Sequence, residues 1–272
     1  MQRRSHFLEK TLSGITQTLE RSLFAEAISL QPGYFQALDP RLKILATLAL
    51  LIGVSTARNL WVIGCVYLLV VCFALASAIP ADFFIRRVWL AVPLFTGLIA
   101  LPALFMVPGQ PLLHLPFGLI VTRTGAQSVL FLLLRVSTSL SIVLLLILTT
   151  PWNTVLAALS VLKVPDVFIL ILGMTIRYIY LLLHIANDMF LSRKSRVIGR
   201  MSGSEERHML AAIGATLLSK SLNMSSEVYL AMVSRGYRGA VVTFKPFRMR
   251  RQDWCWAAFF MAITVLIIYL GR

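Results

Sequence analysis

Long runs of apolar residues without a single charge are the feature that most constrains this chain. They occupy residues 59–81, 88–122, 136–162 and 254–271. Since a helix of about 20 apolar residues crosses the hydrocarbon core of a bilayer, several of these runs are long enough to span one. Only 14% of the residues are charged, against about a quarter in soluble domains. The sequence therefore predicts an all-α polytopic membrane protein, with about five transmembrane helices and long amphipathic cytosolic helices.

Turn signals and charges divide the chain into four regions. These are an N-terminal amphipathic helix and cytosolic entry (1–42), a four-helix transmembrane region (43–150), a cytosolic or interfacial region of long helices (151–252) and a C-terminal span (253–272). In the first region, apolar residues at three- and four-residue steps predict a helix over 5–27. Asp39 is expected to cap a helix that begins at Pro40. The spans of the second region are predicted at 43–57, 60–79, 88–107 and 125–149, with a loop over 108–124.

The distribution of basic residues predicts the orientation. The first 43 residues hold six Lys and Arg and the loop at 80–88 holds two, whereas the opposing loops hold only Arg58 and Arg123. Because basic loops stay in the cytoplasm, the N-terminus is expected inside. The first span is short, so Lys43 and Arg58 are expected to extend toward the headgroups. This bias also accounts for the net charge of +15 without nucleic acid, since no basic run is interleaved with exposed aromatics.

The apolar stretch 165–189 conflicts with a simple count of spans. If it crossed the membrane, residues 190–252 and their twelve Lys and Arg would lie outside. We therefore predict that 153–240 forms cytosolic or interfacial helices, followed by a last span that places the C-terminus outside. The alternative is an ordinary sixth span with the C-terminus inside. Over 205–235, apolar residues at alternating steps of three and four predict a helix that packs on one side.

No catalytic motif is evident in the sequence. There is no phosphate-binding G-x-x-x-x-G-K-[ST] loop, no H-E-x-x-H and no G-x-S-x-G. The four histidines are far apart, and the three cysteines suggest neither a disulfide framework nor a metal site. Arg135 is the one charge well inside a predicted span. Its expected partners are backbone carbonyls, nearby hydroxyls or a distant aspartate, and its role is either structural packing or transport.

Two short basic segments stand out in the third region. Ser195-Arg196-Val197 and Ser234-Arg235-Gly236 each place an arginine between small or apolar neighbours near the end of a predicted helix. Gly236 suits a helix C-terminus. Such an end fits a groove in another protein, where the guanidinium donates several hydrogen bonds to carboxylates or carbonyls. The alternative is a basic face that touches lipid phosphates, and composition alone does not choose between the two.

Together these segments resemble the T component of energy-coupling-factor importers. The resemblance rests on three features: Leu-Asp-Pro-Arg-Leu-Lys before the first span, the long helix pair after the fourth span, and the two small-Arg-small motifs. The N-terminal sequence HFLEKTL…LQPGYFQALDPRLK is similar in particular to the cobalt and nickel branch, the CbiQ family. Both motifs begin with Ser where the family commonly has Ala, and the first ends in Val where Gly or Ser is common.

The resemblance implies a non-catalytic subunit of the bacterial inner membrane in a cobalt or nickel importer. The two arginine motifs would dock two ABC-type ATPase subunits, which bind the ATP, so that the chain itself holds no cofactor and no metal. It would pass their motion to a substrate-binding membrane subunit (an S component, CbiM-like), alongside a small accessory membrane subunit. Two alternatives are a membrane enzyme acting on lipids and a self-sufficient secondary transporter; co-purification of an ATPase pair would favour the coupling subunit.

Overall fold

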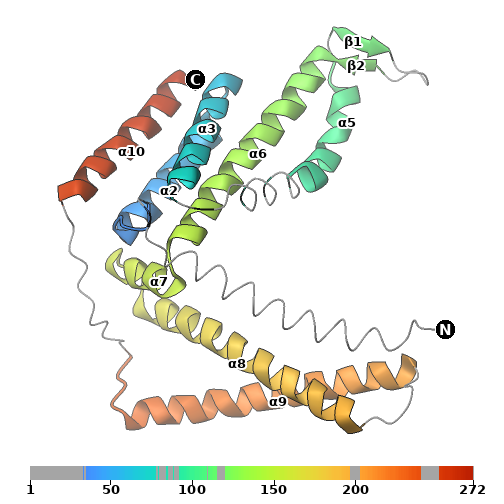
Figure 1. The fold of residues 1–272 in the computed structure, drawn as a ribbon, viewed down its shortest axis with the longest axis vertical. Helices are drawn as coiled ribbons and strands as arrows, with labels where there is room; N and C mark the ends of the chain where they lie inside the picture. Colours follow the sequence, from blue (N-terminus) through green and yellow to red (C-terminus); the bar gives the residue numbers. More distant parts are fainter. Residues whose placement is uncertain are drawn as a thin grey trace. The chain divides into compact units, whose positions relative to one another are not determined.

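The computed structural model describes residues 33, 35–77, 79, 84, 88, 92–108, 110–114, 120–196, 203–239 and 251–271. The predicted all-α fold is confirmed, apart from one short strand pair. The helices are α2 (Pro40–Thr56), α3 (Leu60–Ala76), α5 (Leu98–Met106), α6 (Arg123–Thr149), α7 (Trp152–Val161), α8 (Asp166–Arg196), α9 (Gly203–Ser234) and α10 (Arg251–Leu270), as Figure 1 shows. The predicted helix at 5–27 lies outside the described residues.

Several helices are long and apolar enough to cross a membrane. Among the described residues, length and composition qualify Arg123–Thr149, Asp166–Arg193 and Arg251–Leu270, while Leu60–Ala76, Leu94–Leu104 and Trp152–Val161 are shorter apolar helices. The chain is therefore a multi-pass membrane protein. Because length and composition also qualify most of α8 as a span, its predicted cytosolic or interfacial placement stays a prediction.

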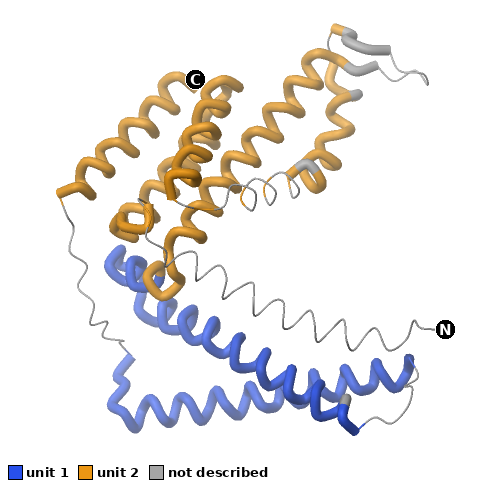
Figure 2. Tube along the Cα trace, viewed as in Figure 1, with its two compact units in different colours: residues 1–25, 156–246 blue, residues 26–155, 247–272 orange. Residues whose placement is uncertain are grey.

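The described helices form two compact units (Figure 2). One unit holds α2, α3, α5, α6 and α10; within it, α2 packs on α6 and α10, and α3 and α5 pack on α6. Gly53 of α2 faces α10, where a Cβ atom would lie 3.4 Å from Ile267, an ordinary van der Waals distance. We refer to this unit as the transmembrane unit.

The start of α2 follows the sequence prediction. Asp39 precedes Pro40, and its carboxylate accepts a hydrogen bond from the backbone N–H of Arg41 at 2.9 Å. The backbone N–H of Asp39 in turn donates to the carboxylate of Asp253 in α10, at 3.3 Å. The cap of α2 is therefore also a contact with the last helix.

Lys43 does not extend toward lipid headgroups, and that prediction is wrong. Its side chain is 3% exposed. The ammonium donates to the carbonyl oxygen of Thr149 at 3.1 Å, to the hydroxyl of Thr150 at 3.4 Å and to the carbonyl oxygen of Gln36 at 3.3 Å. The last carbonyls of a helix have no partner within it, so the end of α6 provides acceptors that hold this lysine inside the protein.

The segment 108–124 is not simply a loop. Its strands β1 (Pro111–His114) and β2 (Ile120–Thr122) pair antiparallel, with Leu113 opposite Val121. Pairing satisfies backbone groups in a segment of largely apolar sequence. The third predicted span is also interrupted, because a π-helical turn, η1 (Pro93–Gly97), precedes α5.

The other unit contains α8 and α9, which run antiparallel (Figures 1 and 2). Phe190 of α8 packs with Met209 and Ile213 of α9 in a buried cluster. The apolar stripe predicted over 205–235 faces this side: Ile213 is buried, and its neighbours on the stripe are half-buried up to Val228. The polar residues of the same segment that lie off the stripe are all exposed: Glu205, Arg207, Lys220, Asn223 and Glu227. The one-sided packing of this helix is confirmed.

Candidate functional site

The two serine–arginine pairs lie at the C-terminal ends of the two longest described helices. Ser195 and Arg196 are the last two residues of α8, whereas Ser234 is the last residue of α9 and Arg235 follows it in the turn. All four side chains are exposed. Val197, which completes the first predicted motif, lies outside the described residues. Both pairs therefore lie at a helix C-terminus. The two pairs are 39 positions apart in the sequence, and this spacing alone does not predict that similarity.

Both serines turn back onto their own helix. The hydroxyl of Ser195 donates to the carbonyl oxygen of Ser192 at 2.8 Å, and the hydroxyl of Ser234 donates to that of Ala231 at 2.9 Å. A serine bonded in this way occupies little more space than alanine and satisfies its own polar group. Within each serine–arginine pair, the arginine is thus the polar group that remains to contact a partner.

The end of α9 is fixed by a glycine turn. Gly236 has a φ of +83°, a conformation that glycine adopts readily and other residues rarely. The N–H of Gly236 donates to Val233 at 2.9 Å, and the N–H of Tyr237 donates to Met232 at 3.0 Å. These two bonds form a Schellman motif. The prediction that Gly236 ends the helix is confirmed, and Arg235 is held at a defined corner of the chain.

The two arginines lie at opposite ends of the helix pair. Arg196 is at the end where α9 begins, and Arg235 is at the far end of α9 (Figure 1). The 32 residues of α9 correspond to about 48 Å at a rise of about 1.5 Å per residue. One binding partner of ordinary size that held both arginines at once would have to cover that whole length, so the geometry suits two separate partners.

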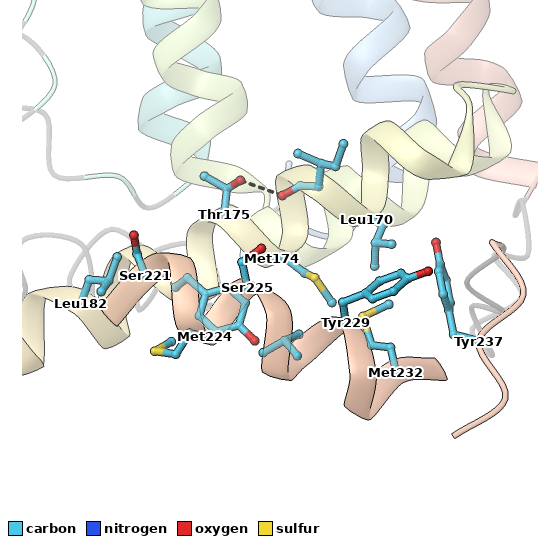
Figure 3. A pocket seen from close by; sticks show the side chains of 13 residues that line it. Leu170, Met174, Thr175, Leu182, Ser221, Met224, Ser225, Tyr229, Met232 and Tyr237 are labelled. Carbon is cyan, nitrogen blue, oxygen red and sulfur yellow. Dashed lines mark hydrogen bonds between the residues drawn. The ribbon is translucent and has the colours of Figure 1, made fainter. Parts of the chain in front are cut away.

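The helices diverge toward the Arg235 end and leave an apolar groove of about 480 Å³ between them. Figure 3 shows the side chains that line it, with Tyr229, Tyr237 and Met232 gathered beside Leu170 and Met174. Tyr237 belongs both to this lining and to the turn after α9. The sequence predicts the stripe on α9 but not the groove, because the angle at which two helices cross depends on both partners.

Arg135 lies in the transmembrane unit, near the middle of α6. Its guanidinium donates to the carbonyl oxygens of Val54 at 3.2 Å, of Ala57 at 3.1 Å and of Ser55. It also lies over the ring of Phe131, 5.1 Å from the centroid. Of the partners expected from the sequence, the backbone carbonyls are those observed. They belong to the C-terminal end of α2, where carbonyls have no partner within the helix.

No group of three or more His, Cys, Asp or Glu side chains capable of holding a metal occurs in the part of the chain that the structure describes. Cys65, Cys72 and Cys255 are free and exposed.

The fold and these helix ends define a multi-pass membrane protein that carries a pair of long helices with an exposed arginine at each end. The family model described as CbiQ, cobalt transport protein, matches residues 34–245. The chain belongs to the CbiQ cobalt transport protein family.

Three relatives extend this result. The chain is 32% identical to an uncharacterized protein of Methanocaldococcus jannaschii over 97% of its own length and 92% of the relative's. It is 26% identical to the nickel permease LarQ of Lactiplantibacillus plantarum, over 85% and 77% of the two lengths. It is 25% identical to the energy-coupling factor transporter transmembrane protein EcfT of Listeria innocua, over 87% and 94%. The chain is therefore a membrane component of a transport system.

Proposed function

We propose that this chain is the energy-coupling transmembrane subunit of an ATP-driven importer of cobalt or nickel. It binds two ABC-type ATPase subunits through Arg196 and Arg235, and it is itself non-catalytic. The observation that carries the proposal is the placement of the two serine–arginine pairs at opposite ends of one helix pair. The likeness to EcfT supports the coupling role, and the likeness to the nickel permease LarQ supports a transition-metal ion as the cargo.

Each arginine would act by inserting into a groove of one ATPase subunit. The serine is bonded to its own helix, so it packs as a small residue while the guanidinium donates to carboxylates or carbonyls of the groove. Because the two ends are separated by the length of α9, closure of the ATPase pair on ATP would move the ends relative to each other. The two helices would carry that motion as rigid levers.

The exposed apolar side of α9 is the surface that would pass the motion on. Leu218 and Leu222 are each 63% exposed, and Tyr229 and Val233 continue the row. A row of this kind packs on an apolar partner, which we propose to be the substrate-binding membrane subunit (S component, CbiM-like), with a small accessory membrane subunit completing the importer. Coupling requires that these contacts differ between the two states of the ATPases. The N-terminus and the α8–α9 pair would then face the cytoplasm.

The test replaces both arginines in the complete importer. Arg196→Ala with Arg235→Ala should abolish metal uptake and co-purification of the ATPases while the chain still inserts into the membrane. Each single change removes one charged hydrogen-bonding group, worth about 1.5–3 kcal/mol, and should weaken ATPase binding about 10- to 100-fold.

Lys220→Ala is the matched control, because Lys220 is an exposed cation near the middle of α9, away from both ends of the helix pair. It should leave both uptake and co-purification unchanged. Full transport by the double variant would reject the docking role of the motifs. Lost uptake with co-purification of the ATPases intact would likewise count against docking through these arginines.

A further inference from the structure

An apolar crevice lies in the transmembrane unit between the first half of α3 and the last half of α10. Its volume is about 320 Å³. Nearly all of its lining is hydrocarbon, and it is formed by Trp61, Val62, Cys65, Val66, Leu69, Ile263, Leu266, Ile267 and Leu270. Trp61 is 86% exposed at its edge. The proposed coupling role does not use this surface.

The crevice covers only about half of the seam between these helices. Along α3 it extends from Trp61 to Leu69, which is about 12 Å at the helical rise and close to half of a hydrocarbon core of about 30 Å. The other half of the seam is closed by aromatic rings. Phe73 of α3 contacts Trp256 and Phe260 of α10, with ring centroids 5.8 and 5.9 Å apart.

A charged residue lies at the open end. Arg58, in the connection that precedes α3, is exposed, and its backbone N–H donates to the carbonyl oxygen of Gly271 at 2.6 Å. The side-chain amide of Asn59 donates to the carbonyl oxygen of Leu270 at 2.6 Å. These bonds fix the connection against the end of α10, beside residues that line the crevice. The connection that carries Arg58 is therefore held beside the open end of the crevice.

We propose that this crevice binds one acyl chain of a membrane phospholipid, with Arg58 paired to the phosphate. The length of the crevice along α3 suits an acyl chain from one leaflet, and its closed inner end fits an acyl chain that terminates near the bilayer centre. A transmembrane helix of another subunit would need a groove along the full seam, which the rings around Phe73 block. The apolar lining and the arginine at its mouth match the two parts of an anionic phospholipid, an acyl chain and a phosphate.

The test uses the full-length chain in vesicles of phosphatidylcholine and phosphatidylglycerol that contain a phosphatidylglycerol with a photoreactive acyl chain. After illumination, peptide mass spectrometry should find the cross-links concentrated on residues 61–69 and 263–270. Cys65→Phe fills the crevice and should abolish these cross-links. Cys72→Phe is the matched control, because it makes the same change at an exposed cysteine of α3 that lies outside the crevice, and it should leave them intact.

Arg58→Gln removes the proposed phosphate partner. It should lower cross-linking of the anionic lipid about tenfold, as loss of a charged hydrogen bond does. If the phosphate alone is bound, cross-linking of a photoreactive phosphatidylcholine should fall by the same factor. Cross-links spread evenly over the surface, or equal loss in both cysteine variants, would overturn the proposal. So would efficient thiol cross-linking of Cys65 to another subunit in the assembled importer, because a protein segment would then occupy the crevice.

Discussion

Replacing Arg135 by methionine tests whether this intramembrane arginine has a structural role. The change removes hydrogen bonds to three carbonyl oxygens at the end of α2, those of Val54, Ser55 and Ala57. If α2 continued, the N–H of Arg58 would donate to the carbonyl oxygen of Val54, but it donates to the carbonyl oxygen of Gly271 instead. The variant therefore leaves acceptors of α2 without their guanidinium donor in an apolar setting.

The size of the effect follows from these bonds. Polar contacts between membrane helices are worth about 0.6 kcal/mol on average and about 1.7 at most, so three of them correspond to about 2–5 kcal/mol. The cost of holding an arginine in the membrane does not offset this, because α6 is inserted in both the packed and the unpacked state. We expect Arg135→Met to lower the free energy of unfolding by that amount.

Unfolding by sodium dodecyl sulfate in mixed micelles, followed by circular dichroism, measures this loss. Arg135→Lys should fall between the parent and Arg135→Met, because one ammonium cannot reproduce the spread of donors of a guanidinium. Arg123→Met is the control: Arg123 is exposed at the start of α6, and its loss should stay within about 0.5 kcal/mol. An unchanged midpoint for Arg135→Met together with lost uptake would refute the structural role and assign the residue to transport.

Two further predictions concern packing and sidedness. Gly125→Ala should destabilise the protein by about 1–3 kcal/mol, since a Cβ atom there would lie 2.8 Å from the carbonyl oxygen of Leu104. Gly64→Ala should stabilise it by about 0.5–1 kcal/mol, since a Cβ atom at this helical position would have nothing within 4 Å. Opposite signs in thermal unfolding are expected, and equal effects would contradict the packing of α5 on α6. Protease added outside intact cells should leave residues 203–239 uncut, and a tag at Ser204 should be reached only after permeabilisation; cleavage from outside would reverse the proposed orientation.

The local features of the sequence predicted local structure well. The cap at Asp39, the glycine turn at Gly236 and the one-sided stripe of α9 all depend on residues within a few positions of one another. Their energetics are set by the backbone of the same helix, so pattern and composition are sufficient. The same holds for the membrane character of the chain, which follows from the length of its uncharged runs.

The fate of the charged residues near the membrane depended on which helix ends meet. Lys43 was expected at the headgroups, yet it is buried because the last carbonyls of α6 lie beside it. Arg135 had several possible partners, and the end of α2 is the one the fold brings to it. These contacts join residues 81 and 106 positions apart, and no pattern of neighbouring residues encodes them.

By itself, the sequence determined that this is a helical membrane protein and where most of its helices begin and end. It also determined that two arginines lie at the ends of long helices. These features follow from the sequence because apolar length, capping and periodicity are properties of a continuous stretch of chain. Only the tertiary structure decided that those arginines occupy opposite ends of one helix pair, that two charged side chains serve the unpaired carbonyls of neighbouring helices, and that a crevice remains between α3 and α10. The physical reason is that packing angles and hydrogen-bond partners are set by elements that are distant in sequence.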